Sequence, residues 1–260
     1  MTVRRALGLS IFVLVLGCGG GGGSKSSSPT AKTKSDVGSH LFAYGQSIVS
    51  TSFAAYGPKF QNHGLPYYDI PLGLWAQIRL GSSNFQENLF VDQGETTPAG
   101  NLFYQTHDAT MSQNGTITIS AGRFNGLTGT LNQTLTGGGY NGTISYTMPN
   151  VATVACQFAL VSDGNGGAFG TGTNAIALQS GYTQNEKIQY KDGGTLVMTT
   201  TDSLGCSSAF NFTPNTSGSG RITGSDPGLP ASLKWDTSGS GTITYADGST
   251  GTFTSYQLSN

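Results

Sequence analysis

The chain carries little charge, and its positive charge is scattered. Only 10% of its 260 residues are Asp, Glu, Lys or Arg, against about 25% in ordinary soluble proteins. From residue 40 onward there are seven Lys and Arg and twelve Asp and Glu, and the basic residues form no cluster. Nucleic-acid binding needs clustered positive charge. The composition therefore argues against a nucleic-acid partner, and its wealth of Gly, Ser, Thr and Asn favours an extracytoplasmic protein.

Histidine and glutamate are scarce, which removes most patterns for catalysis or metal binding. The three histidines, His40, His63 and His107, show neither HxH nor HExxH spacing, so no metal and no cofactor are predicted. There is no G-x-S-x-G elbow for a nucleophilic serine. Glycoside hydrolysis generally needs two placed carboxylates, and most aspartates lie in turn contexts, where they cap the local backbone.

One pair invites a catalytic interpretation, with His107 as a base and Asp108 as the group that orients it. Adjacent residues on a strand point to opposite faces, so the two could pair only in a loop. A loop between strands is the favoured interpretation. A secreted polysaccharide-acting hydrolase, using this pair or converging Asp and Glu side chains, is the alternative.

The chain has no apolar run long enough to span a bilayer as a helix. Its most apolar segment, Ala6 to Leu16, follows Arg4 and Arg5. Eleven helical residues cover about 16 Å, roughly half of a bilayer core. A basic start, a short apolar core and a small residue before a cleavage point describe a signal peptide, predicted here for residues 1–17.

The sequence Val15-Leu16-Gly17-Cys18 ends this segment and resembles the lipobox of bacterial lipoproteins. The resemblance covers about the first 18 residues. It implies cleavage before Cys18, diacylglycerol on the Cys18 sulfur and, in many bacteria, an acyl chain such as palmitate on the new amino group. Membrane lipid is thus an expected partner. Gly19 stands where enterobacterial lipoproteins retained in the inner membrane often carry Asp, which favours the outer membrane.

Residues 18–38 form the predicted linker between the lipid and the folded domain. In this segment, Cys18 is followed by five glycines and then by a Ser-, Lys- and Thr-rich stretch. Such a Gly/Ser-rich segment behaves as a flexible tether, and twenty residues span about 25 Å root-mean-square.

The remainder, 39–260, is predicted to be one antiparallel all-β domain. Helical spacing between residues 39 and 56 predicts one short helix there, and the density of Ser, Thr and Gly makes a strand the alternative. Beyond it, apolar and Thr/Ser/Asn residues alternate with period two, as in strands 74–80, 116–119, 143–148 and 242–245. Asp192-Gly193 and Asp247-Gly248 between such runs predict hairpins. The favoured architecture is sandwich-like, with a barrel as the chief alternative and a division near Asn150 into two β units as a further one.

Cys156 and Cys206 lie among alternating apolar residues, so both sulfurs are expected to face the core. In an oxidising compartment, two such cysteines predict a disulfide. Independent buried thiols are the alternative.

The aromatic residues are the better indication of function. Tyr67, Tyr68 and Trp75 lie close in sequence, and Trp235 is flanked by Lys234 and Asp236. Aromatic faces beside amides and hydroxyls can bind sugar rings, although ordinary core positions would explain them too. The leading hypothesis is a lipid-anchored envelope protein that displays a non-catalytic β domain for binding a glycan or an envelope protein. A structural or adhesin-type role is a further alternative.

Overall fold

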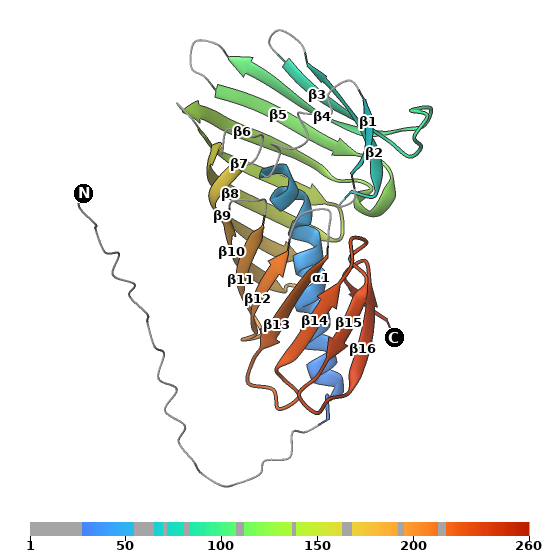
Figure 1. The fold of residues 1–260 in the computed structure, drawn as a ribbon, viewed down its shortest axis with the longest axis vertical. Coiled ribbons are helices and arrows are strands. Elements are labelled where there is room, and N and C mark those ends of the chain that lie inside the picture. Colours follow the sequence, from blue (N-terminus) through green and yellow to red (C-terminus); the bar gives the residue numbers. More distant parts are fainter. Residues whose placement is uncertain are drawn as a thin grey trace, which may run out of the picture.

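The structure is a computed structural model that describes residues 28–54, 65–69, 72–80, 84–107, 112–136, 139–162, 168–191, 195–212 and 217–259. The predicted signal peptide and Cys18 therefore lie outside the described residues. Most of the described chain is β-strand, and Figure 1 shows the strands curling around a single long helix. Within the described residues, no helix combines the length and the apolar character needed to span a membrane.

The helix, α1 (Ala31–Ala54), begins eight residues before the predicted domain boundary at residue 39. The predicted helix is thus confirmed but is longer at its N-terminal end, and residues 31–38 belong to it rather than to a tether. Val37, Leu41, Tyr44 and Ile48 recur at spacings of three and four, which places them on one side of the helix. All four are buried.

In the part of the chain that the structure describes, seventeen strands follow the helix and form one antiparallel sheet, so the predicted all-β antiparallel class is confirmed. Each strand pairs with its neighbours in the chain, and β1 and β17 are the two ends of the sheet, which does not close into a barrel. A short 3-10 helix, η2 (Gly122–Phe124), lies between β5 and β6. The strands are β1 (Pro66–Asp69), β2 (Leu74–Leu80), β3 (Asn84–Phe90), β4 (Pro98–His107), β5 (Ser112–Ile119), β6 (Thr128–Thr136), β7 (Gly139–Met148), β8 (Ala152–Ser162), β9 (Ala168–Leu178), β10 (Thr183–Tyr190), β11 (Leu196–Asp202), β12 (Ser207–Phe212), β13 (Gly218–Thr223), β14 (Ala231–Trp235), β15 (Gly241–Thr244), β16 (Thr250–Thr254) and β17 (Gln257–Leu258).

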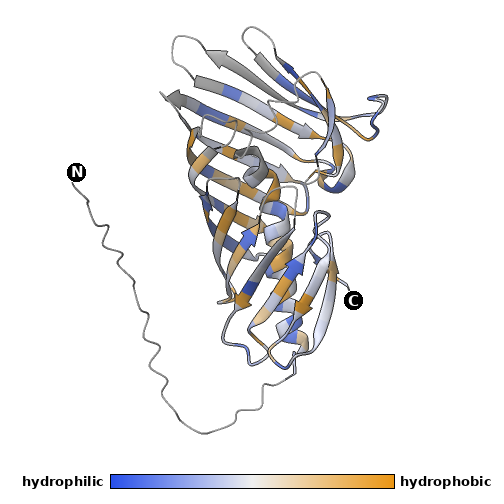
Figure 2. Ribbon diagram, in the orientation of Figure 1, coloured by the Kyte–Doolittle hydropathy of each residue, from blue (hydrophilic) through white to orange (hydrophobic). Residues whose placement is uncertain are grey.

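The predicted alternation of buried and exposed residues is present along the strands. In β10, for example, burial follows a strict exposed–buried pattern, and Figure 2 shows apolar and polar residues mixed along each strand. The apolar residues form one core cluster that includes the buried side of α1. The sheet thus has an inner face, which packs against the helix, and an outer face of Thr, Ser, Asn and Gln.

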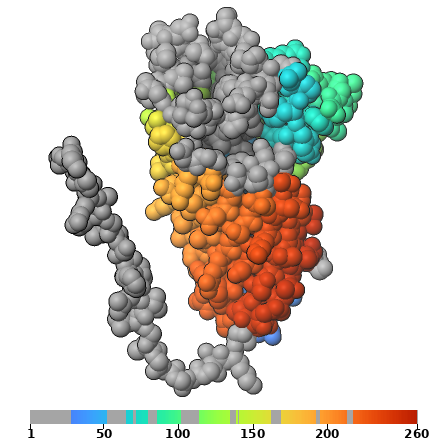
Figure 3. Space-filling view, viewed as in Figure 1, coloured from blue at the N-terminus to red at the C-terminus, as the bar shows by residue number. Residues whose placement is uncertain are grey.

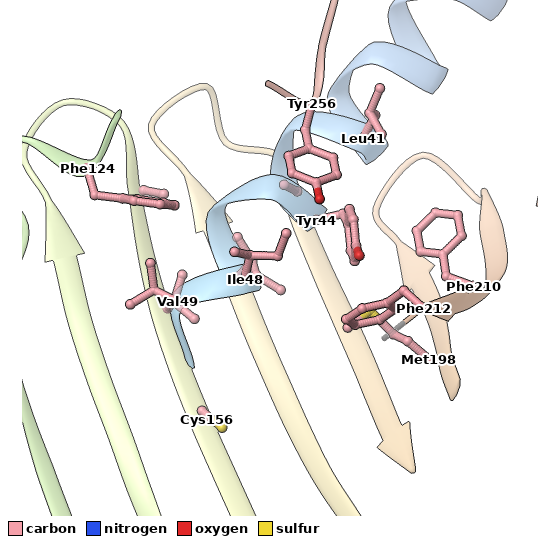
Figure 4. Packing of buried hydrophobic residues seen from close by; sticks show 14 of the residues in the cluster. Leu41, Tyr44, Ile48, Val49, Phe124, Cys156, Met198, Phe210, Phe212 and Tyr256 are labelled. Carbon is pink, nitrogen blue, oxygen red and sulfur yellow. The ribbon is translucent and has the colours of Figure 1, made fainter. Parts of the chain in front are cut away.

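The sheet encloses α1 from two sides. The helix contacts β8, β9 and β10 on one side and β17 on the other. Tyr44, at the middle of the helix, lies against rings from several strands, as Figure 4 shows for some of them. Its ring centroid is 4.9 Å from that of Phe210, 5.7 Å from that of Trp235 and 5.2 Å from that of Tyr256. In Figure 3 the C-terminal strands cover most of the helix.

The predicted disulfide between Cys156 and Cys206 is wrong, because both cysteines are free and buried. Cys156 lies in β8 and Cys206 directly precedes β12, so β9, β10 and β11 separate them. Four strand spacings amount to roughly 19 Å along the sheet, whereas a disulfide needs Cα atoms about 4.4–6.8 Å apart. Alternation correctly predicted that both sulfurs face the core, but it carries no information on how many strands lie between them.

The first prediction concerns these thiols. Burial raises the pKa of Cys156 to about 12 and that of Cys206 to about 11, which keeps both sulfurs protonated and unreactive. A maleimide reagent should therefore label Cys156 and Cys206 only after the protein is unfolded. A Cys156–Cys206 bond would appear as a linked peptide pair in mass spectra of the digested, unreduced protein. We expect no such pair, and its presence would contradict the strand register.

A second prediction concerns the packing of Tyr44. The Tyr44→Ala substitution should lower the free energy of unfolding by about 3–5 kcal/mol, because it leaves a cavity among four aromatic rings. Urea unfolding followed by circular dichroism measures this. Tyr68→Ala is the matched control, since the Tyr68 side chain is 48% exposed, and it should change stability by less than about 0.5 kcal/mol. Equal effects of the two substitutions would contradict the position of the helix.

Candidate functional site

Two groups of side chains have the composition of a functional site, one inside the curled sheet and one on its outer face. The inner group is centred on a row of facing residues that crosses five strands. Strand register places Cys156 (β8) opposite Asn174 (β9), Asn174 opposite Glu186 (β10), Glu186 opposite Thr200 (β11), and Thr200 opposite Ser208 (β12). All five side chains are buried and face α1.

His40 of α1 joins this row to an aspartate, in an arrangement of the Ser-His-Asp type. Its Nδ1 lies 2.9 Å from Oδ2 of Asp202, and its Nε2 lies 3.0 Å from Oγ of Ser208. With Nδ1 donating to the carboxylate, Nε2 is the acceptor for a hydroxyl. Histidine, serine and aspartate in this order can perform nucleophilic catalysis when substrate reaches the serine.

Substrate does not reach this serine, because the group is closed on every side. The side chains of His40 and Asp202 are both 0% exposed. The hydroxyl of Thr200 also lies 2.6 Å from His40 Nε2 and 2.8 Å from the Ser208 hydroxyl. His40 Nε2 and the Ser208 hydroxyl are thus both engaged by Thr200 as well as by each other. We conclude that the group fastens the helix to the sheet.

The carboxylate oxygens of Asp202 accept several hydrogen bonds, as a buried carboxylate requires. It accepts hydrogen bonds from His40, from the Tyr182 hydroxyl at 2.9 Å, and from the backbone N–H groups of Leu204 and Cys206. Burial alone would raise the pKa of Asp202, but these hydrogen bonds, led by that of His40, hold the pKa below its ordinary value. The carboxylate is thus ionised and fixed.

Glu186 is the second buried carboxylate of the inner face. Its two oxygens accept hydrogen bonds from the side-chain amides of Gln184, at 3.0 Å, and Asn174, at 2.8 Å. Asn174 in turn contacts the hydroxyls of Ser50 and Thr51 on α1. Burial raises the pKa of Glu186 to about 7, and these hydrogen bonds reduce the shift without cancelling it. This carboxyl group also links helix to sheet and has no route to a substrate.

The outer face carries a different group, in which aromatic side chains remain accessible. Tyr68 of β1 lies opposite Trp75 of β2, which lies opposite Phe90 of β3. The rings of Tyr68 and Trp75 meet edge to face, with centroids 5.5 Å apart. Tyr68 is 48% exposed, and Trp75 and Phe90 are partly exposed. We call these three residues the aromatic row.

Amide side chains and one guanidinium group lie beside the aromatic row on the same face. Gln77 lies opposite Asn88, and Arg79 lies opposite Gln86. The Arg79 Nε donates to Gln77 Oε1 at 2.9 Å, and the Gln86 amide donates to Asn88 Oδ1 at 2.7 Å. These four residues form the amide cluster, whose mutual hydrogen bonds hold its donors and acceptors in place.

Polar residues continue outward from the amide cluster across neighbouring strands. Asn88 lies opposite Asn101 of β4, followed by Thr118 of β5 and Thr128 of β6. Asn101, Thr118 and Thr128 are exposed and carry no charge. A ligand on the aromatic row would thus meet hydroxyls and amides beside it.

The sequence-predicted site residues fall into three groups. Tyr68 and Trp75 lie on the outer face, as a binding role requires. Tyr67 points to the inner face, where its hydroxyl donates to Glu87, and Trp235 is 5% exposed in the aromatic core. The position of Trp235 argues against a binding role, because its ring is enclosed by the core, and Tyr67 is partly buried with its hydroxyl committed to Glu87. Cys18 and Asp108 lie outside the described residues, and His107 is the last residue of β4.

No protein-family model matches the chain, and no curated protein is significantly similar to it. Among the described residues, no group of three or more His, Cys, Asp or Glu side chains is placed to hold a metal ion.

A third prediction follows from the raised pKa of Glu186. The folded protein holds a proton on Glu186 up to about pH 7, whereas the unfolded chain loses it near pH 4.5. Protonation therefore stabilises the fold below pH 4.5, and this stabilisation is lost as the pH rises toward 7. The pKa difference corresponds to about 3 kcal/mol.

Urea unfolding of the wild type should thus show falling stability between pH 5 and pH 8, and Glu186→Gln should flatten this dependence, since glutamine does not titrate. Glu95→Gln serves as the control, because Glu95 is only partly buried and lies in the turn after β3. Parallel pH profiles for the wild type and Glu186→Gln would show that Glu186 does not sit buried against α1.

Proposed function

We propose that this chain is a lipid-anchored protein of the bacterial cell envelope whose β domain is a non-catalytic module that binds glycan on its outer face. The observation that carries the binding role is the aromatic row beside the amide cluster. Sugar rings bind through apolar contact of their C–H faces with aromatic rings, together with hydrogen bonds from their hydroxyls. The outer face supplies both, within neighbouring positions of β1, β2 and β3.

The proposed anchor is the lipid on Cys18, supported by the lipobox-like sequence and the short apolar segment before it. Two or three acyl chains hold a protein stably on a membrane, where one chain would be marginal. The outer membrane is the favoured location, on the basis of Gly19. The flexible residues predicted after Cys18 would let the domain reach glycan away from the membrane surface.

The non-catalytic part of the proposal is supported by where the acid and base groups lie. His40 of α1 is bonded to Asp202 at the end of β11, and Glu186 is held by the amides of Asn174 and Gln184. Glu87, a further buried carboxylate of the inner face, accepts a hydrogen bond from the Tyr67 hydroxyl. The outer aromatic row has amides and a guanidinium group beside it, and Asp92, in the turn after Phe90, is committed to hydrogen bonds from Thr96 and Thr97 of its own turn. A retaining or inverting hydrolase would need two carboxylates flanking the bond that breaks.

The fourth prediction tests this function. The chain from residue 19 onward should co-sediment with glycan isolated from the envelope of the producing bacterium, without releasing sugar into the supernatant. Trp75→Ala should weaken retention at least about tenfold, equivalent to 1.4 kcal/mol. Phe169→Ala is the matched control, because Phe169 is 42% exposed on the outer face of β9, away from the aromatic row.

Three outcomes would count against the proposal. Released sugar would overturn the non-catalytic role and favour a hydrolase. Retention that Trp75→Ala and Phe169→Ala reduce equally would place binding elsewhere. No retention at all would favour an envelope-protein partner or a structural role.

A further inference from the structure

A groove of about 670 Å³ runs along the N-terminal half of α1, where the sheet leaves the helix uncovered. One wall is formed by the β7–β8 and β9–β10 turns, which contribute Val151 and Leu178. The other wall is formed by the end of β17, through Leu258. The helix provides the floor from Lys34 to Phe42. The groove thus lies in the seam between the middle of the sheet and its C-terminal edge.

An apolar strip runs along this groove, between serine, asparagine and glutamine residues at its rim. Phe42, Val151 and Leu258 are only partly buried and pack against the main core, so their other surfaces face the groove. Leu258 lies close to the helix at Gly38, where a Cβ would be 3.1 Å from Leu258 Cδ1. The one charged lining residue, Lys34, is exposed near the start of the helix. A groove of this size with an apolar strip suits a small apolar ligand.

The position of the groove in the chain indicates which apolar group can fill it. Cys18 is separated from the first residue of α1, Ala31, by twelve residues. A flexible segment of that length spans about 20 Å root-mean-square. The groove lies about 5–17 Å along the helix from Ala31, at 1.5 Å per residue. A tether whose average reach matches the distance to a site gives the tethered group its highest effective concentration there.

We propose that this groove receives one acyl chain of the lipid on Cys18 whenever the protein is away from a membrane. The inference rests on the lipid anchor of the proposed function. The groove covers the acyl chain in water and releases it to a bilayer, where the chain is equally well shielded. Val151 and Leu258 flank the chain from the two walls, and Phe42 lies beneath it. The ligand class is a saturated fatty-acyl chain supplied by the same molecule.

Photo-crosslinking of the full, lipid-processed chain tests this proposal. Bacteria that process the protein are fed palmitate carrying an alkyl diazirine, and the purified protein is moved into detergent-free buffer and irradiated. Peptide mass spectrometry should find intramolecular cross-links at Gly38–Phe42, Val151 or Leu258. Val151→Gln should lower their yield at least fivefold. Val161→Gln is the matched control, because Val161 is 46% exposed on the outer face, and it should leave the yield unchanged.

Each other outcome overturns the proposal in a distinguishable way. If Cys18 carries no labelled lipid, both the anchor and the groove's occupant are wrong. If Cys18 carries the label but cross-links spread over the surface, or join separate molecules, the anchor stands and the groove proposal fails. Equal yields from Val151→Gln and Val161→Gln would lead to the same conclusion.

Discussion

The structure depends on a long helix held inside a curled sheet, and on the pairing of the charged and amide groups that this burial removes from water. An unpaired buried charge or amide would cost several kcal/mol. The interface between α1 and the sheet therefore carries matched sets: His40 with Asp202, Thr200 and Ser208, and Ser50 and Thr51 with Asn174 and thereby Glu186. Around them, Tyr44 and its aromatic neighbours supply the apolar contact. The polar pairs also fix the rotation of α1 about its own axis, because each polar side chain of the helix has one partner position on the sheet.

This use of the interior decides where function can lie. Residues that would perform acid–base chemistry in an open cleft hold the helix in place here, so their chemistry is not offered to solvent. Under the proposed function, recognition falls to the outer face, which offers aromatic rings, amides and hydroxyls. Tyr68, Trp75 and Phe90 gather on three neighbouring strands because the register aligns them. The seam beside Phe42 is where the sheet leaves the helix open, and we propose a different kind of ligand for its apolar strip.

Much of the fold could be predicted from the sequence, because period-two alternation reports which residues face the core and Asp-Gly turns mark hairpins. The strand pairing of β15 with β16 around Asp247 is an example.

Alternation does not report distance across a sheet, which is why the disulfide of Cys156 and Cys206 was predicted and is wrong. Nor could it reveal the inner polar group: His40 and Asp202 are 162 residues apart and meet only through the strand order. The one local signal was that polar Asn174, Glu186, Thr200 and Ser208 occupy inward positions of otherwise apolar faces, a pattern that suggests buried pairing. Trp75 and Trp235 looked alike in sequence, and only the register separates the outer residue from the core residue.

That contrast provides the most direct test of the central claim, which is that recognition belongs to the outer face of β1–β3 while the interior stays closed. The chain has two tryptophans, so its nuclear magnetic resonance spectrum should contain two indole N–H signals, assigned with Trp75→Phe. On titration with soluble fragments of envelope glycan, the Trp75 signal should shift progressively and the Trp235 signal should stay in place. A shift of Trp235 without one of Trp75, or no shift of either signal at saturating glycan, would contradict the account.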